Sequence, residues 1–228
     1  MDMDMNTDAN ANHDQITLET AAGPAAAYVA TPAGGTGPGV LVLHAWWGLN
    51  DDFRRWCDEL AAAGFVALAP DYRAGRVART IEEADAMRGD FGVEQTQSIV
   101  ESAHDELLRR SEGGAVGIVG ASMGAAWAFH LAETRPGQVD AVVAYYGISD
   151  ADWSAIEARV LHHFGDRDQM DPLEDAEAMQ SELEKAGVHA RLEVYAGADH
   201  WFAEPSRTEH DAEAATLAWS RTLDFLRG

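Results

Sequence analysis

Lysine is almost missing from this 228-residue sequence: of its 16 basic residues, only Lys185 is a lysine and the rest are arginines. Acidic residues are far more numerous, with 39 Asp and Glu, and the formal net charge is −23. A surface of this sign repels phosphate backbones and anionic lipid headgroups. We therefore expect neither nucleic acid nor a membrane as a partner.

The combination of many carboxylates with few ammonium groups resembles the composition of proteins from salt-accumulating halophiles. The physical reason is screening, because concentrated salt weakens the repulsion between carboxylates that would otherwise destabilise the compact state. This pattern informs us about the solvent in which the protein works. It carries no information about a reaction.

Cysteine is limited to Cys57, so an internal disulfide is excluded. Cys57 recurs at helical spacing with Phe53, Trp56 and Leu60, which predicts that they share the apolar face of a helix. A single cysteine in such a pattern indicates core packing rather than redox chemistry.

Long apolar runs are also missing, and none of the runs present is long enough to span a bilayer. Residues 1–14 are polar and acidic, unlike a secretory leader, in which a basic segment precedes an apolar one. We expect this segment to be a disordered tail and the protein to be cytoplasmic. Residues 15–228 are then expected to form one domain.

The rest of the sequence alternates between short apolar runs and amphipathic stretches. The apolar runs predict strands at residues 15–20, 25–30, 40–43, 65–69, 115–119, 139–145, 160–164 and 191–195. The amphipathic stretches predict helices at residues 51–63, 93–110, 125–133 and 172–186, and a last one with Ala215, Trp219, Leu223 and Leu226 on one face.

This alternation predicts an α/β fold, a mostly parallel twisted sheet with helices on both faces. The chain has little length beyond these elements, so we expect no separate lid domain. Ligands bind such sheets outside the carboxyl ends of the strands, and functional residues should follow strands. Residues 70–93 form the longest stretch without strong periodicity and are expected at the rim of a pocket.

A G-x-S-x-G motif, residues 120–124, lies directly between the strand at 115–119 and a helix-forming segment. The sharp turn needs strained backbone angles at Ser122, and the flanking glycines let strand and helix pack closely. The helix N-terminus adds free N–H groups that stabilise an anion. We therefore expect Ser122 to be a nucleophile, with the Met123 N–H as an oxyanion donor.

A serine nucleophile needs a base and an acid, which in this fold follow in the order Ser, Asp, His. His200 lies in a glycine-containing loop after the last strand and is the expected base; His162 and His163 are its nearest rivals, but they lie in an apolar run typical of core histidines. For the acid, Asp166, Asp168 and Asp171 compete after the preceding strand. We prefer Asp168, although position alone does not separate it securely from Asp166.

At four places the sequence resembles the dienelactone hydrolase family, the carboxymethylenebutenolidases and their relatives, which have the α/β-hydrolase fold. The matching segments are residues 44–50, 69–72, the Gly165-x-x-Asp168 loop and 199–202, and the similarity runs from residue 15 to residue 228. The resemblance selects Asp168 over Asp166 and implies that the Trp46 N–H is the second oxyanion donor. It also implies cleavage of small esters or lactones.

Two positions depart from the family pattern. The best-studied members have cysteine where this chain has Ser122, and a glutamate that controls that cysteine where this chain has Ala45. A serine activated by a histidine does not need that glutamate. A family arginine that holds the substrate carboxylate is Glu204 here, so the resemblance does not extend to recognition of an anionic dienelactone.

The expected function is that of a serine hydrolase acting through an acyl-enzyme on a small ester or lactone, as a monomer or homodimer and with no cofactor or metal. Alternatives are an acyltransferase, thioesterase or peptidase with the same triad, or a non-catalytic binding protein on this scaffold. Residues expected at the substrate pocket are Trp47, Arg73, Arg76 and Trp201. Arg79 and Arg207 are further candidates for a cation that binds a substrate anion, although arginines on a surface this acidic more often pair with its carboxylates.

Overall fold

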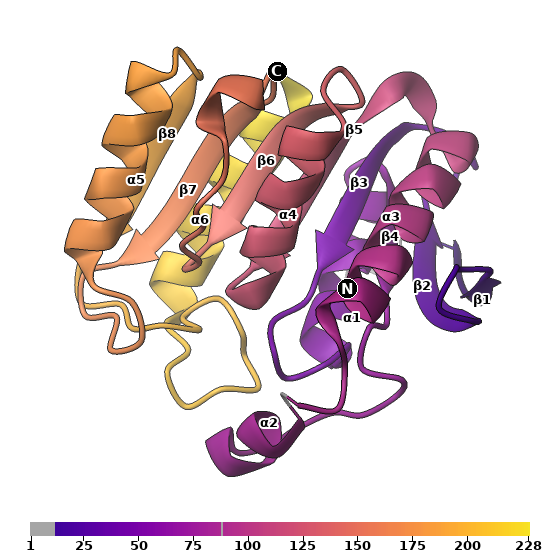
Figure 1. The fold of residues 1–228 in the computed structure, drawn as a ribbon, viewed down its shortest axis with the longest axis horizontal. Helices are drawn as coiled ribbons and strands as arrows, with labels where there is room; N and C mark the ends of the chain where they lie inside the picture. Colours follow the sequence, from indigo (N-terminus) through magenta and orange to yellow (C-terminus); the bar gives the residue numbers. More distant parts are fainter. Residues whose placement is uncertain (1–11, 88) are drawn as a thin grey trace, which may run out of the picture.

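The computed structural model describes residues 12–87 and 89–228, in which an eight-stranded sheet is covered by helices (Figure 1). The strands are β1 (Asn12–Leu18), β2 (Ala25–Thr31), β3 (Pro38–Leu43), β4 (Val66–Pro70), β5 (Glu112–Ala121), β6 (Val139–Tyr145), β7 (Arg159–Gly165) and β8 (Ala190–Tyr195). The helices are α1 (Asp51–Ala62), α2 (Ile81–Met87), α3 (Val93–Arg110), α4 (Met123–Thr134), α5 (Leu173–Lys185) and α6 (Ala212–Arg227), with a 3₁₀ turn η1 (Trp153–Ala155).

The strands lie in the order β1-β2-β4-β3-β5-β6-β7-β8. All neighbours from β4 to β8 are parallel, whereas β1 and β2 form an antiparallel hairpin and β2 pairs antiparallel with β4. The expected mostly parallel sheet is thus confirmed. Because parallel strands end at the same edge, the loops after β3, β5, β7 and β8 meet there.

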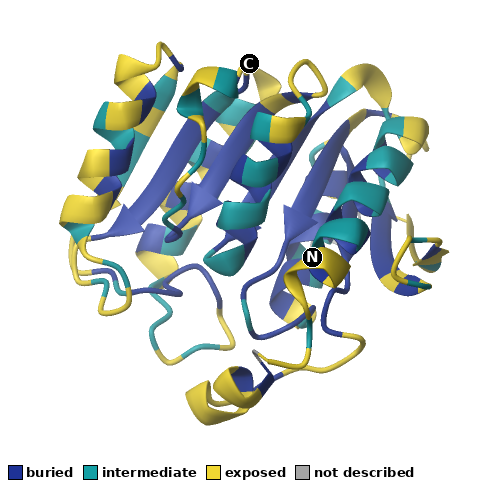
Figure 2. Cartoon of the chain, viewed as in Figure 1, coloured by how far each residue is buried: buried dark blue, intermediate teal, exposed yellow. Residues whose placement is uncertain are grey.

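Alternate residues of the central strands enter two separate hydrophobic cores. In β3, Val40 and Val42 belong to one core, and Leu41 and Leu43 to the other. The first core is closed by α1 and α6 and the second by α3, α4 and α5, which lie on opposite faces of the sheet (Figure 1). Coverage of both faces explains why β3, β4, β6 and β7 are buried almost throughout and have continuous apolar sequences (Figure 2). The edge strand β1 is mostly exposed.

Local sequence explains where the helices on the first face begin. The Asn50 side chain caps α1 by accepting hydrogen bonds from the N–H groups of Asp52 and Phe53 at 3.0 and 3.3 Å. Asp211 caps α6 in the same way. Cys57 is fully buried in the first core, as its spacing predicted.

Two features differ from the sequence-based expectation. β1 begins at Asn12, so residues 12–14, expected in the tail, pair with β2; the remainder of the expected tail lies outside the described residues. α2 was not predicted, because it is short and buries only Ala84 and Met87, too few for a recognisable period. It lies beside the loops at the carboxyl edge of the sheet (Figure 1). Among the described residues, no helix is long and apolar enough to cross a membrane.

Candidate active site

Ser122 occupies the turn between β5 and α4, with φ 51° and ψ −117°. Gly124 allows α4 to approach β3 closely at this turn, because a Cβ at this position would overlap the carbonyl oxygen of Leu43. The Ser122 N–H donates to the Tyr145 carbonyl at 2.8 Å, which ties the turn to β6. The serine is therefore held on strained backbone at the N-terminus of α4.

The structure brings the three residues expected to form a triad within hydrogen-bonding distance. His200 Nε2 lies 3.0 Å from Ser122 Oγ, and His200 Nδ1 lies 2.6 Å from Asp168 Oδ2. The side chains of His200 and Asp168 are nearly inaccessible to solvent, with exposed fractions of 4% and 1%. The second oxygen of Asp168 accepts from the N–H groups of Met170 and Asp171 at 2.8 and 2.9 Å. These bonds orient the carboxylate toward the imidazole.

The loops that carry Asp168 and His200 are joined through their backbones. The Arg167 N–H donates to the Ala198 carbonyl at 3.0 Å, and a Cβ on Gly165 would overlap that same carbonyl oxygen. The glycine of the Gly165-x-x-Asp168 loop is thus required by the close approach of the histidine loop.

The rival acids have other surroundings. Asp166 is exposed and accepts a hydrogen bond from the Gly197 N–H at 2.6 Å, which braces the histidine loop. Asp171 is half-buried, and burial raises its pKa above the ordinary value. Neither bonds to the His200 imidazole, whose Nδ1 faces Asp168.

The rival histidines are buried within the sheet. His163 lies 3.1 Å from Thr222 Oγ1 and 2.9 Å from the Tyr195 hydroxyl, and burial holds its pKa well below the usual range. His162 is also buried, and desolvation lowers its pKa to about 4. Both are neutral core side chains of β7, as the apolar run predicted.

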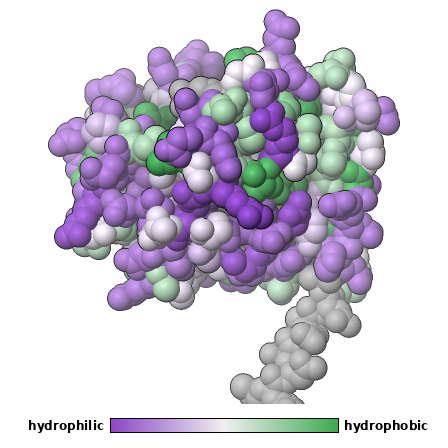
Figure 3. Space-filling view, turned by 90° about the horizontal axis from the view of Figure 1, so that it is seen from below, coloured by the Kyte–Doolittle hydropathy of each residue, from purple (hydrophilic) through white to green (hydrophobic). Residues whose placement is uncertain are grey.

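A cavity of about 330 Å³ opens at the triad. Residues from six segments line it: Trp46, Arg73, Ala84, Ser122, Met123, Met170, Asp171, His200 and Trp201. Figure 3 views the molecule from the side of the carboxyl edge and shows apolar side chains grouped within a mostly hydrophilic surface. The Trp46 and Trp201 rings stack with centroids 6.2 Å apart and form one wall. The segment at 70–93 contributes Arg73 and Ala84, in keeping with its expected place at the rim.

Two residues expected at the pocket lie elsewhere. Trp47 is fully buried behind the cavity, where its ring meets Trp201 edge-on at 4.9 Å and the Arg207 guanidinium lies 3.7 Å above it. Arg76 forms an exposed ion pair with Asp90 and does not line the cavity. Consecutive side chains leave a loop in different directions, so the neighbours of a site residue need not share its pocket.

Arg73 is the guanidinium that lines the cavity. It is buried, its Nη2 lies 3.1 Å from Met123 Sδ, and it packs over the Phe91 ring at 5.2 Å. Its backbone N–H donates to Asp71 Oδ1 at 2.9 Å, which fixes the loop after β4. Sequence reasoning missed Met170 and Asp171 as lining residues, although their place directly after Asp168 was a usable signal.

The two expected oxyanion donors also belong to the cavity wall. Met123 is the first residue of α4, where an N–H has no partner within the helix. Trp46 follows β3 in the loop at 44–50, next to the buried Ala45. Behind this loop His44 stacks on Tyr72 with ring centroids 3.6 Å apart.

Glu204, which occupies the family arginine position, does not line the cavity. It is fully buried, and its Oε1 accepts a hydrogen bond from the Tyr146 hydroxyl at 2.9 Å. Burial, followed by the negative charge of Asp52, raises its pKa to about 8.

A second cavity of about 340 Å³ lies between α1 and α6. Its lining residues are Arg55, Trp56, Glu59, Tyr145, Ala203, Pro205, His210, Ala212, Ala215, Thr216 and Trp219. Within residues 12–87 and 89–228, no group of three or more His, Cys, Asp or Glu side chains is placed to hold a metal ion.

Comparisons with known proteins identify relatives of this chain. The chain is 31% identical over 216 residues to a carboxymethylenebutenolidase of Pseudomonas putida, covering 88% of this chain and 89% of that protein. It is 30% identical over 212 residues to Protein usf of Aquifex pyrophilus, covering 88% and 91%. A solved structure described as a dienelactone hydrolase-like promiscuous phosphotriesterase, from metagenomic libraries, superimposes with a TM-score of 0.84 at 23% identity, covering 95% of this chain and 98% of that one.

A solved structure described as an α/β hydrolase also superimposes on this chain, with a TM-score of 0.70, so the fold is that of the α/β hydrolases. Residues 25–228 match the sequence profile of the dienelactone hydrolase family, which is most of the chain. This chain therefore belongs to the dienelactone hydrolase family.

Proposed function

We propose that this member of the family is a serine hydrolase that cleaves small carboxylic esters or lactones through an acyl-enzyme. The observation that carries the proposal is the continuous hydrogen-bonded line from Ser122 Oγ through His200 to Asp168, with steps of 3.0 and 2.6 Å. A serine hydroxyl is a weak nucleophile until an adjacent base takes its proton, and this line supplies the base and its orienting acid.

In the proposed reaction, Ser122 Oγ attacks the substrate carbonyl while its proton passes to His200 Nε2. Asp168 accepts the hydrogen bond from Nδ1–H and stabilises the imidazolium that forms. The N–H groups of Met123 and Trp46 stabilise the oxyanion. His200 then donates its proton to the leaving oxygen, and water, activated by the same histidine, releases the acid from Ser122.

The cavity supports small substrates. Its volume of about 330 Å³ accommodates a compact ester or lactone, and the aromatic wall of Trp46 and Trp201 favours an apolar portion. Arg73 provides a positive charge in the lining of the same cavity. These features favour a substrate that combines an apolar ring or chain with a polar or anionic group.

The test is hydrolysis of p-nitrophenyl acetate by the purified protein and by Ser122→Ala. We expect turnover to fall at least about 10³-fold in the variant, because the nucleophile is lost. Ser154→Ala, in the exposed turn η1, is the matched control and should retain full activity. A fluorophosphonate should label the wild type and not Ser122→Ala.

Turnover retained in Ser122→Ala would contradict the proposal. Product analysis with ester, thioester and peptide substrates, in the presence of alternative acyl acceptors, separates the esterase from a thioesterase, a peptidase or an acyltransferase. Absence of both turnover and labelling in the wild type would instead favour a binding protein.

A further inference from the structure

Strained backbone is concentrated around the triad. Among the described residues, the non-glycine residues with positive φ are Ala74, Ser122, Tyr146 and Trp201. Ser122 carries the nucleophile and Trp201 lines the cavity, but the mechanism above gives Tyr146 no role. A bulky residue at φ 39° is unfavourable, so its backbone hydrogen bond and the contacts of its side chain must together compensate for the strain.

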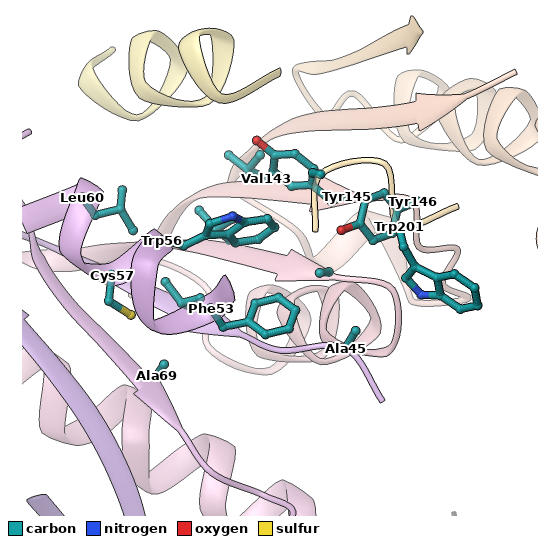
Figure 4. Close-up of a cluster of buried hydrophobic side chains, with 14 of the residues drawn as sticks. Ala45, Phe53, Trp56, Cys57, Leu60, Ala69, Val143, Tyr145, Tyr146 and Trp201 are labelled. Carbon is teal, nitrogen blue, oxygen red and sulfur yellow. The ribbon is translucent and has the colours of Figure 1, made fainter. Parts of the chain in front are cut away.

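Tyr146 follows β6 directly, and its ring lies against the His200 imidazole, with centroids 5.0 Å apart at 53°. Its N–H donates to the His163 carbonyl at 2.8 Å, and its hydroxyl donates to Glu204 Oε1 at 2.9 Å. The preceding Tyr145 points away toward α6, where its hydroxyl meets Thr222, while Tyr146 extends toward Trp201 (Figure 4). The hydroxyl groups of these two consecutive buried tyrosines thus bond to different partners, Thr222 and Glu204.

Glu204 belongs to the same loop as His200, and its N–H donates to the Trp201 carbonyl at 2.9 Å. Within the described part of the chain, its Oε2 is buried without a hydrogen-bond partner. The charged and titratable groups that act on it are Tyr146 from the end of β6, Asp52 from α1, and Arg207 and Glu209 from its own loop.

A fully buried carboxylate with one bare oxygen is costly, and the neutral acid is the cheaper form. The raised pKa of about 8 agrees with this geometry. Glu204 therefore meets the Tyr146 hydroxyl as a neutral hydrogen-bond acceptor at neutral pH. This role requires the oxygen and does not require the charge.

We propose that Tyr146 and Glu204 form a positioning pair that holds the His200 imidazole in line with Ser122 Oγ, with Glu204 acting as a neutral acceptor. The inference rests on the proposed function, since it concerns the base of that reaction. The hydrogen bond fixes the Tyr146 ring, and the ring limits the space into which His200 can tilt. Neither residue touches the substrate, so loss of the pair affects the rate of chemistry and leaves substrate binding unchanged.

The experiment measures kcat and KM for p-nitrophenyl acetate in Tyr146→Phe, Glu204→Leu and Glu204→Gln. We expect kcat to fall about tenfold in the first two variants with KM unchanged, because the imidazole is less well aligned. Glu204→Gln should stay within about twofold of the wild type, because its amide oxygen still accepts from Tyr146. The double variant Tyr146→Phe/Glu204→Leu should be no slower than the slower single variant.

Tyr145→Phe is the matched control, since it also removes a buried tyrosine hydroxyl, at the adjacent position, but one that bonds to Thr222. It should leave kcat unchanged. If Tyr146→Phe behaves like Tyr145→Phe, or if Glu204→Gln is as slow as Glu204→Leu, the positioning role is overturned. Thermal unfolding checks that each variant is folded, and the near-isosteric Tyr146→Phe carries the test should Glu204→Leu fail to fold.

If the proposed function itself is wrong, the experiment gives a different result. In that case the wild type neither hydrolyses the ester nor reacts with a fluorophosphonate. An active wild type whose Tyr146→Phe variant labels as fast as Tyr145→Phe overturns the positioning pair alone.

Discussion

The two cavities of this protein have almost equal volumes, about 330 Å³ at Ser122 and about 340 Å³ between α1 and α6. Both have aromatic walls, and both include a guanidinium and a carboxylate: Arg73 and Asp171 in the first, Arg55 and Glu59 in the second. Size and composition therefore do not distinguish them.

The positions of the two cavities relative to the sheet distinguish them. The cavity at Ser122 lies where the loops after β3, β5, β7 and β8 meet, so groups distant in sequence converge on one point. The second cavity is walled mainly by α1, α6 and the loop between His200 and α6, and within the described residues it has no hydrogen-bonded nucleophile and base. Convergent reactive groups, rather than volume, mark a site for chemistry.

The largest expected effect tests Asp168, the proposed acid at the Ser122 cavity. In Asp168→Asn, kcat should fall about 10³- to 10⁴-fold, because an amide does not stabilise the imidazolium or hold the required tautomer. The assay is ester hydrolysis under saturating substrate. Asp166→Asn is the matched control: its amide oxygen can still accept from the Gly197 N–H, so activity should change only slightly. Comparable losses in the two variants would count against Asp168.

The next effect concerns Glu204, whose sequence neighbours Ala203 and Pro205 line the second cavity. Burial raises its folded-state pKa from 4.5 to about 8, so the folded protein holds this proton more tightly than the unfolded chain does. The resulting stability is complete below about pH 4.5 and is lost as the pH rises to about 8. Relative to Glu204→Gln, the wild type should lose on the order of a few kcal/mol of unfolding free energy across this window.

Denaturant unfolding of both proteins at several pH values measures that difference. Glu59→Gln is the control from the second cavity: its pKa is also raised by burial, but its side chain is 42% exposed, so the pH-dependent difference should be smaller. A difference between the wild type and Glu204→Gln that does not change with pH would show that Glu204 is ionised throughout.

Much of the fold was predictable, because the central strands are buried on both faces and α3 shows a sustained helical period. The 139–145 strand and the 93–110 helix have the expected bounds. α2 and the beginning of β1 were not predictable. α2 has only two buried residues, and the alternation of β1 is weak because most of the strand is exposed.

At the site, the motif and the sequence order pointed to Ser122 and His200, and the family resemblance selected Asp168 over Asp166. The structure brings these three side chains together, because strand ends in a parallel sheet meet at one edge. Their catalytic roles remain predictions, as does the need for salt. The pocket wall was harder: Trp46 lines the cavity and Trp47 does not. Side-chain direction in a loop depends on tertiary packing, which has no period in the sequence.

A smaller effect compares the guanidinium groups of the two cavities. In Arg73→Met, kcat/KM for an anionic ester such as p-nitrophenyl hemisuccinate should fall about tenfold relative to p-nitrophenyl acetate, because a charge-assisted contact is lost. Arg55→Met, in the second cavity, should leave this ratio unchanged. An unchanged ratio in Arg73→Met would show that the cavity does not select for anions.

The smallest effect comes from the same substitution made in each cavity. Ala84→Leu adds bulk to the wall of the Ser122 cavity and should raise KM for p-nitrophenyl acetate several-fold, roughly 1 kcal/mol of lost binding. Ala215→Leu adds the same bulk to the second cavity and should change kcat and KM by less than about twofold. Thermal unfolding of both variants controls for overpacking, which is the larger risk at Ala84 because it is 2% exposed. If Ala215→Leu lowers kcat while the protein stays folded, the second cavity is coupled to the first. We would expect this coupling to act through the loop that carries both Glu204 and His200.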